Sequence, residues 1–526
     1  MATERLQRLA RPGLVAGAVL LALALYLLNT GLGNLNQDEG WYLYAALEQA
    51  GGRMPYRDFF FSQGPLMPAV YGLLAPLWAP LGLLGGRLLT VGFGLASGAL
   101  TALLAAQAVP KPRRWAAAIT AWLLTAGNVY HAYFTTIPKT YALAACLLVS
   151  GILALSLAPR RHGACWAAAG GFLLALAACT RLSLGAALPV AGLVLLGQHR
   201  RLPRAWLGFG LGGAAGLGLL LGPVLLRDAE AFLFANFFHT TRGTEGFLFA
   251  AGSVSRLVRN YLPLAALALT LPLLGRRGPR AGQGGGAPGL LFTLGLPVFA
   301  AVFIVHLLSP FPYDDYQVPI MPLAAAAVAA AFWRALPADH GAGEGAGTRS
   351  TAAVLGVILL GCAVGAGTST LNEAWVTIGK DRFWVIKKTS PDLVVLRETA
   401  REIAAQVPPD VPLLTQDAYL AVEARRRVPR GFEMGPFSYF PSLSDADARR
   451  YHVVNANLLT AILERAESPV AAFSGYGFAL EAPVMTPVPE ADRKRFETIL
   501  ARHYRLERIV PHFGQEHTPL SIWIRP

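Results

Sequence analysis

The chain has 526 residues, of which 54% are hydrophobic and only 14% charged, and its mean hydropathy is +0.45. This composition excludes an ordinary soluble protein of this length and is typical of a membrane protein with several spans. The net charge of +14 does not indicate nucleic-acid binding, because Lys and Arg form short clusters between apolar runs, where such clusters usually set topology.

The N-terminal segment is basic from Met1 to Arg11 and precedes an apolar run from about Leu14 to Leu28. A signal peptide has a similar layout, but the Asn-Thr-Gly-Leu-Gly sequence that follows lacks a small-residue cleavage pattern. We therefore expect a retained signal anchor with a cytoplasmic N-terminus.

Three pieces of chain after this anchor, residues 37-42, 54-59 and 63-66, gather ionisable and aromatic side chains beside a bilayer. They contain three carboxylates and an arginine, namely Asp38, Glu39, Asp58 and Arg57. Ionisable groups near a membrane are costly, so this cluster is a hypothesis for a functional site. The alternative is a solvated loop with an interfacial belt of Trp and Tyr, and chemistry alone does not separate the two.

Eleven mostly apolar stretches of suitable length predict transmembrane helices. They cover residues 12-30, 86-108, 115-131, 141-158, 164-180, 182-198, 205-226, 258-275, 288-308, 317-335 and 351-371. The basic clusters between them then fall on the same side as the N-terminus, which is cytoplasmic by the positive-inside rule. The first loop therefore faces outward. The apolar run 66-84 contains three prolines and would invert this scheme as a span, so we expect interfacial helices there and over 38-49.

Further polar groups lie in the loops of the same outward face. Lys139 frames one loop, Arg181 sits in a break between two short spans, and Arg242 lies in a long loop from Arg227 to Arg259. Tyr313, Asp314, Asp315 and Tyr316 precede a later span. Arg and Lys suit phosphate. The alternatives are that Arg57 and Lys139 snorkel at the interface, that the tyrosines form a belt and that the aspartates solvate a loop.

Composition changes after Leu371, where charges reach ordinary density and no further span-length run occurs. We predict a transmembrane domain over 1-371 and a soluble α/β domain over 372-526. Its expected helices are near 393-405, 418-426, 457-467 and 493-503, with strands near 411-415, 470-473, 505-510 and 520-524. The odd number of spans places this domain outside, with the carboxylates. The fold class is thus an α-helical multi-span membrane protein with interfacial helices and a C-terminal α/β domain.

Four of these features together resemble a known family. They are Asp38-Glu39 soon after the first span, PYRDFFFSQGPL at 55-66, Thr180-Arg181, and YDDYQVPIMPLAA at 313-325. The pattern is similar to that of the GT-C superfamily of integral membrane glycosyltransferases, and within it to the branch of protein O-mannosyltransferases and lipid A aminoarabinose transferases. In that branch the later motif usually opens with His-Tyr, where this chain has Asp315-Tyr316.

The resemblance implies transfer of a sugar from a polyprenyl-phosphate donor to a lipid, glycan or protein acceptor, at the outer face of the plasma membrane. We expect Asp38 to be the base for the acceptor hydroxyl, with Glu39 or Asp58 orienting the acceptor or the base. Arg57, Lys139, Arg181 and Arg242 are the candidates for binding the donor phosphate. Tyr56, Tyr313, Asp314, Asp315 and Tyr316 are the candidates for binding substrate. Some relatives use a divalent cation, for which Asp38, Asp58 and Asp314 offer oxygen ligands.

Two other functions remain open at this stage. A transporter or lipid flippase would favour internal repeats and acids deep in the bilayer, whereas this chain places its acids at the rim. An O-antigen polymerase or ligase would use basic outer loops without an Asp-Glu pair in the first loop.

Overall fold

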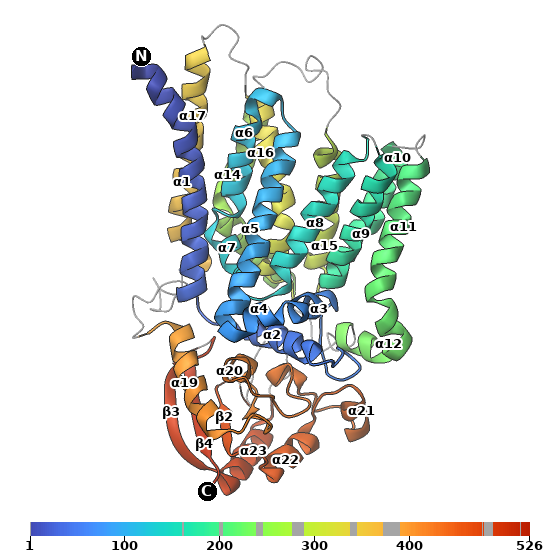
Figure 1. Cartoon of the computed structure of the whole chain (residues 1–526), viewed down its shortest axis with the longest axis vertical. Helices are drawn as coiled ribbons and strands as arrows, with labels where there is room; N and C mark the ends of the chain where they lie inside the picture. Colours follow the sequence, from blue (N-terminus) through green and yellow to red (C-terminus); the bar gives the residue numbers. More distant parts are fainter. Residues whose placement is uncertain are drawn as a thin grey trace.

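The computed structural model describes residues 2-159, 162-198, 203-237, 246-275, 289-336, 344-371, 390-475, 477, 488-515 and 517-526. Long helices run side by side in one bundle, and the C-terminal helices and strands cap a single end of it (Figure 1). Three short elements lie between the bundle and this cap. They are α2, α3 and α4, which belong to the first loop.

Each of the eleven predicted spans contains a helix. The helices are α1 (Ala2–Leu32), α5 (Leu83–Gln107), α6 (Arg114–Thr125), α8 (Thr140–Leu157), α9 (Gly163–Thr180), α10 (Ala187–Gln198), α11 (Pro203–Leu220), α14 (Leu262–Gly275), α15 (Leu296–Leu307), α16 (Met321–Ala335) and α17 (Glu344–Thr368). Among the described residues, five helices are long and apolar enough to cross a membrane, or up to seven if each of two bent pairs counts as one span. Three further apolar helices are shorter. The chain is an integral membrane protein of the predicted fold class.

Two predictions within the bundle are wrong in detail. The expected straight span 205-226 ends at Leu220, where Gly222-Pro223 turns the chain by 60° into α12 (Gly222–Asn236). The expected loop from Arg227 to Arg259 is helical in its described parts, in α12 and in α13 (Phe247–Asn260), which meets α14 at 88°. Arg227 of α12 contacts Met54 of the first loop, and Arg256 of α13 contacts Asp314.

The first loop forms the expected interfacial helices. They are α2 (Gln37–Ala50), α3 (Leu66–Leu73), α4 (Ala75–Trp78) and the 3-10 turn η1 (Ala79–Leu81). Prolines divide the run 66-84 because each removes a backbone donor and disfavours helix before it. The short pieces lie against the bundle end instead of crossing it (Figure 1). The prediction of interfacial helices is therefore confirmed.

The C-terminal part is a small α/β unit, as predicted. It contains α19 (Asp392–Gln406), β1 (Leu414–Thr415), α20 (Ala418–Ala424), α21 (Asp445–Arg450), α22 (Ala456–Arg465), β2 (Val470–Phe473), α23 (Glu490–His503), β3 (Arg505–Phe513) and β4 (Thr518–Ile524). The strands lie in the order β1-β2-β4-β3. β1 and β2 are parallel, and the other pairs are antiparallel, with Val470 opposite Ile524. The predicted boundary at 371/372 borders residues outside the described ones.

The C-terminal unit docks directly on α2. A Cβ atom at Gly40 would lie 2.3 Å from the Tyr419 nitrogen, so only glycine allows α2 and α20 to approach this closely. The Val428 amide donates to the Tyr44 hydroxyl (3.0 Å), and the Leu83 amide donates to Glu423 (2.8 Å). One hydrophobic cluster includes buried residues of both regions. The first loop is thus held between the bundle and the C-terminal unit.

Candidate active site

Asp38 lies in the first turn of α2, at a helix start that the sequence specifies. The Asn36 side chain accepts a hydrogen bond from the Asp38 amide (3.1 Å), and Glu39 accepts one from the Asn36 amide (2.9 Å), which is a capping box. A carboxylate in the first turn is stabilised by the helix dipole. The Asp38 side chain keeps 24% of its surface exposed. It is therefore both fixed in place and accessible.

A single lysine joins Asp38 to the later acidic motif. Lys139 Nζ lies 2.7 Å from Asp38 Oδ2 and 3.1 Å from Asp315 Oδ2. Tyr141 donates a hydrogen bond to the same Asp315 oxygen (2.9 Å). Burial by itself would lower the pKa of Lys139, but Asp38, Tyr141 and Asp315 together raise it well above its usual value. Lys139 is therefore a permanent cation between two carboxylates.

Arg181 is a second cation at this site, held by aromatic rings. It follows the end of α9 in an extended conformation, where the close packing of Gly64 on the Cys179 carbonyl brings in the first loop. Its guanidinium lies 4.5 Å from the ring centre of Tyr316 and 5.0 Å from that of Tyr141. Among the described residues, its buried Nε has no hydrogen-bond partner. A buried donor without a partner is costly and marks a position where a ligand atom fits.

Asp314 lies beside Asp315 but contacts a different set of residues. It accepts hydrogen bonds from Tyr130 (2.6 Å) and Arg256 (3.0 Å), and Asn260 lies 3.5 Å away. Sequence reasoning missed Arg256 and Tyr130. Arg256 lies on α13, whose position next to the 313-316 motif depends on the bend between α13 and α14, whereas Tyr130 lies on the short helix α7 (Val129–Phe134).

Tyr42 is another residue that sequence reasoning left without a role. It lies one helical turn after Asp38 and is buried. Burial raises the pKa of its hydroxyl, with a further contribution from Asp38 and opposing ones from Arg181 and Lys139. The spacing of four residues on one helix could have identified it.

Glu39 does not share the centre with Asp38. Its carboxylate accepts two hydrogen bonds from Arg87 (2.6 and 2.7 Å), and both side chains are fully buried. Arg87 also donates to the backbone carbonyls of Thr30, Gly33 and Asn34. This pair ties the end of α1 to α2 and α5. An arginine within the apolar run of α5 was the signal that sequence reasoning overlooked.

Arg57 and Asp58 lie beyond the far end of α2, which is about 20 Å long. Arg57 pairs with Asp58 through two bonds (3.0 and 2.6 Å), so this pair is separated from Asp38. Tyr56 is buried and donates to the Gln63 carbonyl. Its ring contacts Phe61, which in turn contacts Tyr42 of α2.

Two tyrosines among the remaining candidates lie near Asp38 and Lys139. Tyr316 contacts Arg181, and Tyr313 packs against Tyr316, with 5.5 Å between ring centres. Arg242 lies outside the described residues. Within the described residues, no group of three or more His, Cys, Asp or Glu side chains could hold a metal ion. The expected ligands Asp38, Asp58 and Asp314 are not gathered into one set.

Comparison with known proteins identifies the fold. No protein-family model matches the sequence, and no curated protein matches it. Two crystal structures of ArnT from Cupriavidus metallidurans, one in the apo state and one bound to undecaprenyl phosphate, match with a TM-score of 0.61 at 16% identity. Each match covers 97% of this chain and 98% of the other. The oligosaccharyltransferase of Archaeoglobus fulgidus matches at 12% identity and a TM-score of 0.48, over 89% of this chain and 70% of the other.

The two ArnT matches show that the chain has the same fold as ArnT, an aminoarabinose transferase. The resemblance to GT-C glycosyltransferases that the sequence indicates is confirmed at the level of fold.

Proposed function

We propose that this protein is a membrane glycosyltransferase that moves a sugar from a polyprenyl-phosphate donor to an acceptor hydroxyl. The shared fold supports the class of protein, and the ArnT structure with bound undecaprenyl phosphate supports the kind of donor. The observation that carries the proposal is the set of ion pairs Asp38–Lys139–Asp315 beside Arg181. In it, the Asp38 carboxylate lies next to two cations, one of which has a buried donor without a partner among the described residues.

In the proposed reaction, Asp38 takes the proton of the acceptor hydroxyl as its oxygen attacks the anomeric carbon. The new carbon–oxygen bond forms on the face opposite the phosphate, so the configuration inverts. The bond from the anomeric carbon to the phosphate oxygen breaks, and its electron pair stays on the phosphate. General-base catalysis of this kind contributes about 10²–10⁴-fold.

Preorganised cations stabilise the departing phosphate. Arg181 lies between the rings of Tyr141 and Tyr316 with its Nε free to donate, and Lys139 is the N-cap residue of α8. The α8 start has no side-chain cap, and the buried hydroxyl of Thr140 has no hydrogen-bond partner among the described residues. Free amides at a helix start suit an oxyanion. A phosphate bound there competes with Asp38 for Lys139 and so frees Asp38 to act as a base.

The remaining residues receive supporting roles in this proposal. Asp315 and Tyr141 hold Lys139 in place, and Tyr316 and Tyr141 hold Arg181. Glu39 is a positioning residue, because it fixes the start of α2 through Arg87. Asp314 with Arg256 borders the centre on the side of α13 and is a candidate for binding the sugar or the acceptor.

The proposed location is the outer face of the plasma membrane. Arg113 and Arg334 bind backbone carbonyls at the ends of α16 and α5. These helix ends lie at the end of the bundle away from α2 and the C-terminal unit (Figure 1). If these basic residues face the cytoplasm, as the positive-inside rule predicts, Asp38 and the domain proposed over 372-526 are extracytoplasmic. The N-terminus is then cytoplasmic, and residues 1-371 form the catalytic transmembrane domain.

The proposal is tested with the full chain in nanodiscs and a panel of undecaprenyl-phosphate sugars. The measurement is release of undecaprenyl phosphate in the presence of a membrane extract as the source of acceptors. Wild-type protein should release it, and Asp38→Asn should reduce the rate at least 100-fold. Asp410→Asn, which changes an exposed aspartate of the C-terminal unit, is the control. Equal rates for wild type and Asp38→Asn would reject the proposal.

A further inference from the structure

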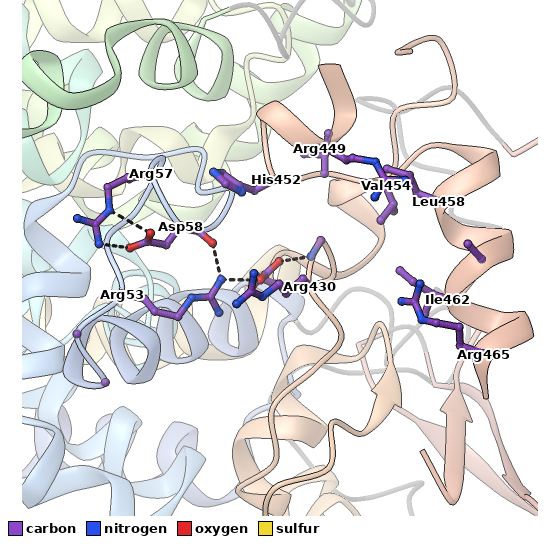
Figure 2. A pocket seen from close by; sticks show the side chains of 16 residues that line it. Arg53, Arg57, Asp58, Arg430, Arg449, His452, Val454, Leu458, Ile462 and Arg465 are labelled. Atoms are coloured by element: carbon purple, nitrogen blue, oxygen red, sulfur yellow. Dashed lines mark hydrogen bonds and ion pairs between the residues drawn. The ribbon is translucent and has the colours of Figure 1, made fainter. Parts of the chain in front are cut away.

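A second pocket lies where the segment after α2 meets the C-terminal unit, far from Asp38. Its volume is about 620 Å³. Figure 2 shows Arg53, Arg57 and Asp58 entering it from the first loop. The opposite walls come from the segment at Arg430 and from the stretch between Arg449 and Arg465. We call it the basic pocket.

The charges in the basic pocket are unbalanced. Five arginines and His452 line it, against the two carboxylates of Asp58 and Glu433. Three of these arginines are already engaged, since Arg57 pairs with Asp58, Arg53 with Glu48 and Glu433, and Arg465 with Glu467. Arg430 and Arg449 form no ion pair with a carboxylate in the part of the chain that the structure describes, and both are exposed. Two guanidinium groups therefore face the pocket with their donors available.

The wall opposite Arg57 has a different character. Val454, Leu458 and Ile462 line it, beside the small residue Ala461 (Figure 2). Gly51, Gly52 and Gly431 line other parts and leave the backbone accessible. Cationic groups opposite an apolar wall fit a ligand that has one anionic group and one face of C–H bonds. A saccharide that carries a phosphate has both features, and guanidinium groups bind phosphate through paired hydrogen bonds.

The pocket exists only because the two regions are docked. His452 lies beside the Arg57 backbone, and Arg53 lies 3.3 Å from Glu433. Near the pocket, Arg450 and Tyr451 bind Glu230 of α12 (2.5 and 2.6 Å). The first loop, α12 and the C-terminal unit thus hold the backbone of the pocket walls in place before any ligand arrives.

We propose that the basic pocket is a second binding site, specific for a saccharide bearing a phosphate group and separate from the reaction centre. α2 places about 20 Å between the pocket and Asp38, so one small sugar does not reach both. The role of this ligand rests on the proposed function. If the protein is a glycosyltransferase, this ligand is the acceptor. Because the acceptor must occupy the pocket and also reach Asp38, it is a long glycan that carries a phosphate group.

Binding is measured directly on the full chain in nanodiscs of zwitterionic lipid, with mannose 6-phosphate as the probe and mannose as its uncharged match. The test variant is Arg430→Ala with Arg449→Ala. The control is Arg401→Ala with Arg427→Ala, which removes two exposed arginines of the same unit that do not line the pocket. A second variant, Ala461→Glu, adds a carboxylate to the pocket at an exposed position and leaves every arginine in place.

The expected result is saturable binding of mannose 6-phosphate that weakens at least tenfold in the test variant and in Ala461→Glu, but not in the control. Added salt should weaken it as well. Equal affinity in wild type and test variant would overturn the proposal, as would an equal loss in the control. Binding only in nanodiscs of anionic lipid, with none of the soluble probe, would overturn it in favour of a lipid headgroup.

The two proposals fail in different ways. Asp38→Asn should bind mannose 6-phosphate like wild type, because α2 separates Asp38 from the pocket. Pocket-dependent binding without any release of undecaprenyl phosphate would reject the transferase and keep the pocket. Release of undecaprenyl phosphate without pocket-dependent binding would reject the pocket and keep the transferase.

Discussion

Lys139 Nζ lies 2.7 Å from Asp38 Oδ2 and forms the ion pair on which the proposed chemistry depends. The same nitrogen lies 3.1 Å from Asp315, so one buried cation neutralises carboxylates of two distant segments. Without it, the two carboxylates would face each other across the site without an intervening cation. The ion pair of Asp38 therefore depends on what else Lys139 binds.

Replacing Lys139 with methionine should reduce transfer by about 10²–10³-fold, the usual loss on removing one preorganised charge from a reaction centre. Methionine keeps most of the apolar stem, so the protein should still fold. The measurement is the rate of undecaprenyl phosphate release at saturating donor, together with the melting temperature. Lys139→Arg, which keeps the charge, should retain more activity than Lys139→Met. Equal activity of wild type and Lys139→Met would contradict the proposed role.

The Glu39–Arg87 pair predicts a defect in stability. Arg87→Ala leaves a buried carboxylate without its partner, which typically costs about 3–5 kcal/mol. Thermal unfolding in detergent should show a clearly lower melting temperature. Replacing both residues with leucine should recover part of the loss, since no unpaired charge remains. If Glu39 instead acted on the substrate, Glu39→Gln would lower the rate while leaving the melting temperature unchanged.

Much of this layout could be predicted from the sequence because it depends on local patterns. Apolar length located the helices, prolines located the interfacial pieces, and acids after the first span drew attention to Asp38. The separation of Asp38 from Glu39 is also a local effect, because adjacent residues on a helix point about 100° apart and do not share a face. Treating the two as one catalytic pair overlooked this geometry.

The convergence on Lys139 could not be predicted in the same way. Lys139, Arg181 and Asp315 belong to separate elements, and their meeting depends on how the long helices pack. Asp58 shows the opposite case, since it is near Asp38 in sequence but lies past the far end of α2. Arg256 reaches Asp314 only through the 88° bend at α13, which hydropathy does not reveal.

Docking of the C-terminal unit on α2 should be sensitive to a single methyl group. In Gly40→Ala, the new Cβ would meet the backbone of Tyr419 at 2.3 Å, and backbone does not yield cheaply. Overpacking of this kind typically costs about 1–3 kcal/mol. We expect a lower melting temperature and slower transfer, because the start of α2 carries Asp38.

The matched control for this substitution is Gly51→Ala at the other end of α2. There the nearest atoms to an added Cβ lie 3.4 and 3.5 Å away, and φ is −78°. This variant should melt like wild type. Equal behaviour of the two variants would mean that α2 and α20 separate without consequence.

Glu433 predicts a dependence of stability on pH. Burial raises its pKa from 4.5 to about 7, although Arg53 opposes the shift. Below about pH 4.5 the group is neutral in both the folded and unfolded states, so its contribution to folding is complete. As pH rises to 7, the unfolded chain ionises first, and up to about 3 kcal/mol of this contribution is lost.

Glu433→Gln removes this titration, so the fall in melting temperature between pH 5 and 7 should be smaller than in wild type. The nearby charged and titratable groups, Arg53, Glu48 and Tyr44, remain in the variant. If the melting temperatures of wild type and Glu433→Gln fell in parallel between pH 5 and 7, Glu433 would not titrate in this range.

Arg181 should control the affinity for the donor through its shape as well as its charge. Arg181→Lys keeps the positive charge but loses the planar group that lies 4.5 Å from the Tyr316 ring centre, together with the unpartnered Nε. Lysine offers phosphate a flexible point charge instead of a fixed fork, so the two are not equivalent at a stacked site. We expect the KM for the undecaprenyl-phosphate sugar to rise about tenfold, which corresponds to about 1.4 kcal/mol. Arg181→Met should also lower kcat, because the leaving phosphate then keeps only Lys139. An unchanged KM in both variants would place the donor phosphate elsewhere, and Arg256 would be the next cation to test.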